Sequence, residues 1–203
     1  MPRKIFRQAA AVPVATGLRL VKKWLVEFSY ELDGPQGRGY TLKMLEPLPD
    51  EYFMRDALRL AEKACAADEV PVGAIVAREG KIIARAHNQV ELLKDATAHA
   101  EMLALTQAEA AVGDWRLTDC DLYVTKEPCA MCAGAVVHTR IRRVIFGCPD
   151  PAAGAAGSMM NLLQMPTFNH RCEITSGVLQ KECAAILQEF FRKRRDDQGS
   201  TIS

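Results

Sequence analysis

The sequence lacks a long apolar run: none approaches the ~18 residues that a membrane-spanning helix needs, so we expect no membrane contact. It also lacks an excess of charge, because the formal net charge is +1 over 203 residues. Nucleic-acid binding therefore cannot be inferred from overall charge and must depend on local clusters. No internal repeat is visible.

Closely spaced cysteines are scarce as well. Among seven cysteines, only Cys129 and Cys132 are near neighbours. The others are scattered among apolar residues and are Cys65, Cys120, Cys148, Cys172 and Cys183. This odd, dispersed set does not suit a disulfide framework. We predict buried free thiols in a reducing compartment, and hence a cytoplasmic protein.

Acidic residues are missing from the first 26 positions, and residues 1–43 hold eight Lys or Arg against three Asp or Glu. Pro13 and Gly17 interrupt the apolar run, so a secretory signal is poorly formed. Three interpretations remain open: a transit-like leader, a basic extension that contacts RNA, or sequence upstream of the true start. The third is favoured, because Met44 begins a stretch that runs directly into the domain. We expect residues 1–43 to be disordered.

The remaining chain has periodic segments of two kinds. Apolar residues at helical spacing predict helices over residues 51–66, 98–111 and 130–138 and a last helix that carries Leu179 and Phe190. Runs rich in β-branched residues predict strands at residues 72–78, 81–87, 121–125, 143–146 and 173–175, the first two joined by a Glu79-Gly80 turn. Strands that alternate with helices predict an α/β sheet covered by helices, made mixed by the hairpin. We expect one domain over residues 46–197, capped at its start by Asp50, and a disordered tail at 198–203.

Two short motifs carry the chemistry: Thr97-Ala98-His99-Ala100-Glu101 and Glu127-Pro128-Cys129-Ala130-Met131-Cys132. His99, Cys129 and Cys132 offer the nitrogen and sulfur ligands that zinc prefers. No second Cys-x-x-Cys is present to close the site, and catalytic zinc sites keep a position open for water. Zinc lowers the pKa of bound water to about 7, which makes a zinc-bound hydroxide nucleophile. Glu101 can take the water proton and return it to a leaving amine.

The spacing within the motifs suits helix starts. Cys129 and Cys132 lie three apart and share one helix face, with Pro128 at the first helical position. Glu101 and His99 are two apart, so they can flank a metal only near a helix start, where Thr97 is the expected N-cap. A structural zinc knuckle, or unrelated thiols and a core histidine, is the alternative. The complete pattern favours a catalytic zinc.

From about Asp50 to Arg195 the chain resembles the bacterial tRNA-specific adenosine deaminases, in the cytidine deaminase superfamily. The matching stretches include residues 69–74, 97–101, 122–125, 127–135, 154–158, 169–171 and 190–192. The resemblance implies a cytidine-deaminase-like three-layer α/β/α fold with a central mixed five-stranded sheet. It implies a homodimer with one zinc ion per subunit. It also implies hydrolytic deamination of the wobble adenosine to inosine in a tRNA anticodon stem-loop.

The resemblance also implies residue roles. His99, Cys129 and Cys132 are implied as metal ligands and Glu101 as the proton shuttle. For the substrate, it implies that Asn88 reads the flipped base and that the backbone amide of Ala100 contacts the base. Val70 and Pro71 are implied as the apolar wall of the base pocket, with Glu69 at the mouth of the pocket. Asp150 is implied as a contact to the RNA backbone or ribose. From the sequence alone, Asn88 reads more simply as a turn residue after a strand, and Asp150 as a turn residue after Pro149. Cys148 and Ala152 depart from the family pattern on either side of Asp150.

Basic residues gather in two places after position 43. Arg140, Arg142, Arg143 and residues 192–195 hold seven of the 18 Lys and Arg there. Such clusters suit phosphates, and we predict Arg192, Arg194 and Arg195 as contacts to the RNA backbone. The alternative is a solvated helix end that complements the helix dipole.

Two other functions compete with the tRNA enzyme. A deaminase of free nucleosides or bases would use the same zinc chemistry, but it would not need basic residues along a helix end. A zinc-held RNA-binding subunit without catalysis would not need the carboxylate of Glu101. Both features therefore favour the tRNA adenosine deaminase.

Overall fold

A computed structural model describes residues 26–28, 42–44 and 48–199. The chain divides into two units, Met1–Leu45 and Glu46–Ser203. In the first unit, β1 (Val26–Phe28) pairs antiparallel with β2 (Leu42–Met44). The disorder expected for the rest of residues 1–43 and for 200–203 falls outside the described residues.

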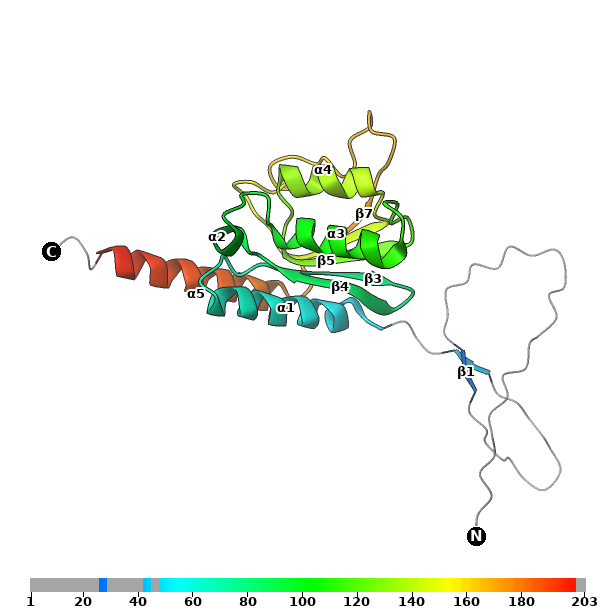
Figure 1. Cartoon of the computed structure of the whole chain (residues 1–203), viewed down its shortest axis with the longest axis horizontal. Coiled ribbons are helices and arrows are strands. Elements are labelled where there is room, and N and C mark those ends of the chain that lie inside the picture. Colours follow the sequence, from blue (N-terminus) through cyan, green and yellow to red (C-terminus); the bar gives the residue numbers. More distant parts are fainter. Residues whose placement is uncertain (1–25, 29–41, 45–47, 200–203) are drawn as a thin grey trace, which may run out of the picture. The chain divides into compact units, whose positions relative to one another are not determined.

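A five-stranded sheet forms the centre of the second unit (Figure 1). Its strands are β3 (Gly73–Arg78), β4 (Lys81–His87), β5 (Cys120–Lys126), β6 (Arg143–Cys148) and β7 (Glu173–Ser176). Their order is β4-β3-β5-β6-β7. The β4-β3-β5 part is antiparallel and the β5-β6-β7 part is parallel, so the predicted mixed sheet is confirmed.

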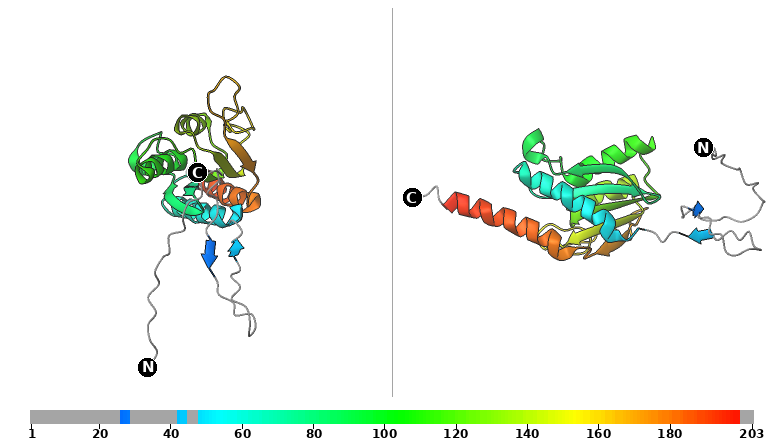
Figure 2. Two further views of the ribbon diagram at one scale, coloured as in Figure 1. Left: turned by 90° about the vertical axis from the view of Figure 1, so that its right-hand side faces the viewer. Right: turned by 90° about the horizontal axis from the view of Figure 1, so that it is seen from below.

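Helices cover both faces of this sheet (Figures 1 and 2). They are α1 (Asp50–Ala66), α2 (Val90–Leu93), α3 (Ala100–Val112), α4 (Ala130–Thr139) and α5 (Gln180–Gly199). The pair α1 and α5 packs on one face, and α3 with α4 lies on the other. The three-layer α/β/α architecture is thus confirmed. No described helix is both long and apolar enough to cross a membrane.

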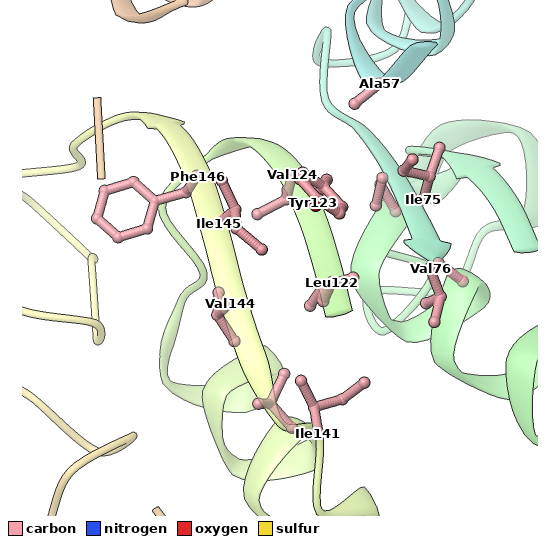
Figure 3. Packing of buried hydrophobic residues seen from close by; sticks show 14 of the residues in the cluster. Ala57, Ile75, Val76, Leu122, Tyr123, Val124, Ile141, Val144, Ile145 and Phe146 are labelled. Atoms are coloured by element: carbon pink, nitrogen blue, oxygen red, sulfur yellow. The ribbon is translucent and has the colours of Figure 1, made fainter. Parts of the chain in front are cut away.

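The core lies between the central strands and the two helical layers (Figure 3). In β5, Leu122, Tyr123 and Val124 are all buried, because both faces of a central strand are covered. The Tyr123 ring stacks on Phe53 of α1, with ring centroids 4.9 Å apart. A Cβ on Gly73 would lie 2.1 Å from the Ala57 carbonyl oxygen. Helix α1 therefore packs directly against the start of β3 only because that residue is glycine.

The hairpin turn lies where the sequence predicts it, but three other local predictions are wrong. Glu79 and Gly80 both have positive φ, as a two-residue hairpin turn requires. The short helix α2 lies where the sequence predicts neither a helix nor a strand, and residues 198–199, expected in the tail, belong to α5. Asp50 is not the N-cap of α1, which is Pro49. Its carboxylate instead accepts hydrogen bonds from the Tyr123 hydroxyl at 2.9 Å and from Arg143 at 2.7 Å.

Candidate active site

The structure brings His99, Cys129 and Cys132 together. Nδ1 of His99 lies 3.7 Å from Sγ of Cys129 and 3.5 Å from Sγ of Cys132, and the two sulfurs are 3.7 Å apart. Among the described residues, these three form the one cluster of His, Cys, Asp or Glu that could hold a metal ion. Cys132 is buried, and the other two are half-buried.

The donor set and its spacing fit a tetrahedral metal. Bonds of roughly 2.3 Å to sulfur and 2.0 Å to nitrogen at tetrahedral angles would separate two sulfurs by about 3.8 Å, and a sulfur from a nitrogen by about 3.5 Å. The distances among His99, Cys129 and Cys132 match those values. One nitrogen and two sulfurs leave a fourth position for water, as in catalytic sites.

Two helix starts hold the ligands, although not with the predicted caps. His99 is the N-cap residue of α3, and Thr97 instead donates its hydroxyl to Asp95 at 2.7 Å. Cys129 is the N-cap residue of α4, so Pro128 precedes the helix instead of occupying its first position. The expected result still holds, because all ligands lie at the N-cap or within the first turn of a helix, where its dipole stabilises anionic sulfur.

Charge within the cluster is distributed unevenly. Hydrogen bonds from Cys132 and from His99 lower the pKa of Cys129 to about 3. The same contact with Cys129, together with burial, raises the pKa of the Cys132 thiol. The hydrogen bond with Cys129 raises the pKa of His99, against the effect of burial. Metal binding would release the protons that remain on Cys132 and His99, because metal ligands must be deprotonated.

Glu101 is buried, at 4% exposure, in the first turn of α3. Burial raises the pKa of its carboxyl, while the neighbouring His99 charge works in the opposite direction. A carboxylate with a raised pKa accepts a proton more readily than a solvated one does. Its position beside the ligand cluster suits the proton shuttle that the sequence predicts.

The region around Asn88 lies next to the ligand-bearing segments. Its neighbour Gln89 donates its amide to the Ala98 carbonyl at 3.1 Å, directly before His99. The Asn88 side chain is buried and bonds to buried Glu69. Val70 is half-buried and Pro71 is buried, in the segment that leads into β3. Ala100 is the first residue of α3, so its amide has no partner within the helix.

Sequence reasoning missed the role of Glu127. Its buried carboxylate accepts the backbone amides of Asp150 at 2.9 Å, Ala156 at 2.9 Å and Ser158 at 3.0 Å, and the Ser158 hydroxyl. Burial alone would raise its pKa, but these hydrogen bonds hold the pKa below its ordinary value. A Cβ on Gly154 would lie 2.4 Å from this carboxylate. Glu127 therefore fixes the loop of residues 149–158, called the Gly-Ala loop below, beside the cysteine pair. The available signal in the sequence was a carboxylate directly before Pro-Cys.

Asp150 lies in this loop, buried at 8% exposure. Its carboxylate forms an ion pair with Lys126 at 2.6 Å and accepts the Ala152 amide at 3.1 Å. Burial alone would raise its pKa, but Lys126 and the loop amides hold the pKa below its ordinary value. No pattern in the sequence singles out Lys126, which directly precedes Glu127.

The predicted RNA-contacting arginines lie on α5. Arg192 pairs with Glu189 at 2.8 Å on the same helix. Arg194 donates to the Asp68 carbonyl at 2.8 Å, and no hydrogen bond or ion pair holds exposed Arg195 in the described part of the chain. In the other basic cluster, ion pairs with carboxylates of the domain hold Arg142 and Arg143.

Comparisons with known proteins agree with this geometry. A family profile described as MafB19-like deaminase matches residues 49–195. The tRNA-specific adenosine deaminase of Bacillus subtilis is 51% identical over 146 residues, which cover 72% of this chain and 91% of that protein. A solved structure from a study of A-to-I editing by tRNA:A34 deaminases is 44% identical, with a TM-score of 0.65 over 67% of this chain and 99% of its own. A structure of the guanine deaminase from Nitrosomonas europaea is 27% identical, with a TM-score of 0.61 over 69% of this chain and 83% of its own. The chain therefore belongs to the family of tRNA-specific adenosine deaminases.

Proposed function

We propose that this chain converts the wobble adenosine of a tRNA anticodon loop to inosine by hydrolytic deamination at a zinc ion. The observation that carries the proposal is the cluster of His99 Nδ1 and the sulfurs of Cys129 and Cys132, with Glu101 buried beside it. A structural zinc site would close with a fourth protein ligand, and among the described residues no further His, Cys, Asp or Glu joins this cluster.

His99, Cys129 and Cys132 would hold the zinc ion through one nitrogen and two sulfurs. Zinc held there would lower the pKa of water to about 7, which would supply hydroxide at neutral pH. In the overall reaction, the water oxygen forms a bond to C6 of adenine while the bond from C6 to the amino nitrogen breaks. A carboxylate oxygen of Glu101 would carry one water proton to ring nitrogen N1 and the other to the amino nitrogen, which leaves as ammonia.

The substrate residues are assigned from the resemblance to the tRNA-specific adenosine deaminases. We assign Asn88 and the Ala100 amide to the edge of the flipped base, and Val70 and Pro71 to the apolar wall. Asp150 is assigned to the ribose or RNA backbone beside the pocket. A base in a single-stranded anticodon loop is the least costly to unstack, which supports a loop substrate.

Arginines of α5 are assigned to the RNA backbone. Arg195 carries this role most directly, since its guanidinium is exposed and held by no described partner. Arg192 and Arg194 already have partners within the protein, so they would need to share or exchange them with phosphate.

We further propose that two copies associate and that they act in the cytoplasm. Exposed Trp115 and Phe168 line a hollow of about 250 Å³ beside α4, a surface that a second copy could cover. The free state of all seven cysteines suits a reducing compartment. Light scattering of the full chain, and of Trp115→Ser, tests the dimer.

A substitution that separates catalysis from metal binding tests the proposed chemistry. Glu101→Gln keeps the side-chain shape but cannot carry the proton, so we expect full zinc content and at least about 10³-fold slower inosine formation in an anticodon stem-loop. Glu109→Gln, on the same helix, is the control and should keep wild-type rates. Loss of zinc from Glu101→Gln, or undiminished turnover, would contradict the role of Glu101.

A further inference from the structure

We propose that Glu69 is a positioning residue, which fixes the side-chain amide of Asn88 so that its oxygen, Oδ1, faces the substrate base. The proposal rests on the function proposed above, and it replaces the expected direct contact of Glu69 with substrate. Three groups of observations support it: the contacts of Glu69, the free oxygen of Asn88, and the nearness of both to the ligand cluster.

The carboxylate of Glu69 is fully engaged within the protein. It accepts the Asn88 side-chain nitrogen at 3.0 Å, the Glu91 amide at 3.2 Å and the Leu92 amide at 2.7 Å. Only 1% of the Glu69 surface is exposed. The two amides belong to the first turn of α2, whose own N-cap residue, Gln89, makes no side-chain cap. Glu69 is thus closed to a ligand and serves as the support of Asn88 and α2.

The carboxylate dictates which way the Asn88 amide points. An ionised carboxylate only accepts hydrogen bonds, so the nitrogen of the neighbouring carboxamide must turn toward it. Oδ1 then points away from Glu69, and it accepts no hydrogen bond from the described residues. Among the described residues, Arg143 Nε is the one fully buried side-chain nitrogen or oxygen that lacks a hydrogen-bond partner. Oδ1 of Asn88 also lacks a partner, so this atom cannot be fully buried, and a ligand can reach it.

The backbone around Asn88 is held firmly and close to the ligand segment. Its amide donates to the Val72 carbonyl at 2.9 Å, and its carbonyl accepts Nδ1 of His87 at 2.9 Å. The next residue, Gln89, bonds to Ala98 at 3.1 Å, one position before His99. Because the backbone is fixed, the carboxamide of Asn88 can move only by rotation about its side-chain bonds. The hydrogen bond to Glu69 prevents that rotation.

A fixed carboxamide confers specificity. It presents one acceptor, Oδ1, and the one N–H that Glu69 leaves free. The edge of adenine offers an amino donor beside a ring nitrogen acceptor, which suits that pair. A rotated carboxamide would exchange the two atoms and lose both bonds, and an unpaired polar group in a closed site costs much of the binding.

Exchange of the two side chains tests the proposal in the zinc-loaded full chain. Asn88→Asp places two carboxylates in contact, and we expect kcat/KM on the stem-loop to fall by about 100-fold. Glu69→Gln should lower it by about tenfold, because either amide can now rotate. In the double variant, the new carboxamide at position 69 donates to the new carboxylate at position 88, which again turns an oxygen toward the base. Its kcat/KM should therefore recover at least about tenfold over Asn88→Asp alone. Multiplicative losses in the double variant would overturn the proposal.

Two further measurements separate this proposal from the function on which it rests. Glu91→Gln removes a charge from the same short helix without touching Asn88, and it should keep wild-type kcat/KM. The side-chain amide protons of Asn88, observed by NMR without any substrate, should exchange slowly in the wild type and faster in Glu69→Gln. Equally fast exchange in both would refute the positioning role. Failure of the wild type to form inosine would instead refute the proposed function.

Discussion

The ammonium group of Lys126 lies 2.6 Å from Oδ2 of Asp150, so the last residue of β5 neutralises a carboxylate of the Gly-Ala loop. The pair is partly sheltered, with side-chain exposures of 33% for Lys126 and 10% for Asp150. Lys126 is also near enough to the ligand cluster to oppose the raised pKa of His99. This ion pair therefore links the loop to the end of β5, close to the ligand cluster.

Lys126→Met should weaken both the loop and RNA binding. Because the pKa of Asp150 is held below its ordinary value of 3.8, the pair stabilises the fold above that pH and loses its effect as pH falls through the folded-state pKa. At pH 7 the stabilisation is thus fully present, and we expect a loss of about 1 kcal/mol in urea unfolding. KM for the stem-loop should rise severalfold, because a positive charge near the substrate phosphates is lost. Lys94→Met, which breaks the exposed pair with Glu91, is the control; an equal effect there would contradict the prediction.

Gly154→Ala should dislodge the loop that Glu127 holds. The new Cβ would lie 2.4 Å from the Glu127 carboxylate and 2.6 Å from the Asp150 carbonyl oxygen. Such overpacking costs about 1–3 kcal/mol, and since Gly154 bridges to Cys129, zinc affinity should fall as well. Gly134→Ala in α4 meets nothing within 4 Å and should stabilise the helix by about 0.5–1 kcal/mol. Calorimetry measures the stability of the two variants, and a zinc competition assay measures their zinc affinity. If Gly154→Ala were as stable as Gly134→Ala, the loop would not be rigidly attached to Glu127.

Arg195→Ala should weaken RNA binding through charge alone. Removal of one phosphate contact should lower the slope of log Kd against log salt by about one, with no change in melting temperature. Arg194→Ala should show the same slope change only if the bond to Asp68 yields to phosphate, and it should also lower the melting temperature. Filter binding at several salt concentrations makes the comparison. An unchanged slope in Arg195→Ala would remove this end of α5 from the RNA footprint.

The thiols should react in a graded order. Burial raises the pKa of Cys120, Cys172 and Cys183 to about 12, which leaves about one in 10⁴ of each ionised at pH 8. In the folded, zinc-loaded chain, only half-buried Cys65 should react at once with a thiol reagent, and chelation of zinc should release two more. Since these raised pKa values favour the folded state only while the thiols stay protonated, stability should fall as pH rises from about 9 toward 12. Immediate reaction of all seven would contradict the buried core.

Much of the fold could be predicted because it depends on local patterns. The hairpin follows from Glu79-Gly80, where both residues adopt positive φ, and the ligand cluster follows from spacing within two helix starts. Helix α2 could not be foreseen, because its four residues have no periodicity and its cap, Glu69, lies about twenty positions earlier in the chain.

The support of the site was equally hidden. Glu127 binds backbone amides 23 to 31 positions away, and Arg194 bonds to Asp68 across 126 positions. Such contacts depend on how the chain folds back, and they leave no repeating signal in the sequence. The ligands were therefore evident from the motif, whereas the residues that hold the surrounding loops became visible only in three dimensions.

The most direct measurement offers the zinc-loaded full chain four substrates: a stem-loop with adenosine at the wobble position, the same stem-loop with adenosine elsewhere in the loop, free adenosine and free guanine. Mass spectrometry of the digested products reports inosine and its position. We predict inosine at the wobble position alone. If free adenosine or guanine were deaminated while the stem-loop adenosine was not, the result would contradict the tRNA function. It would place the chain with the small-molecule deaminases.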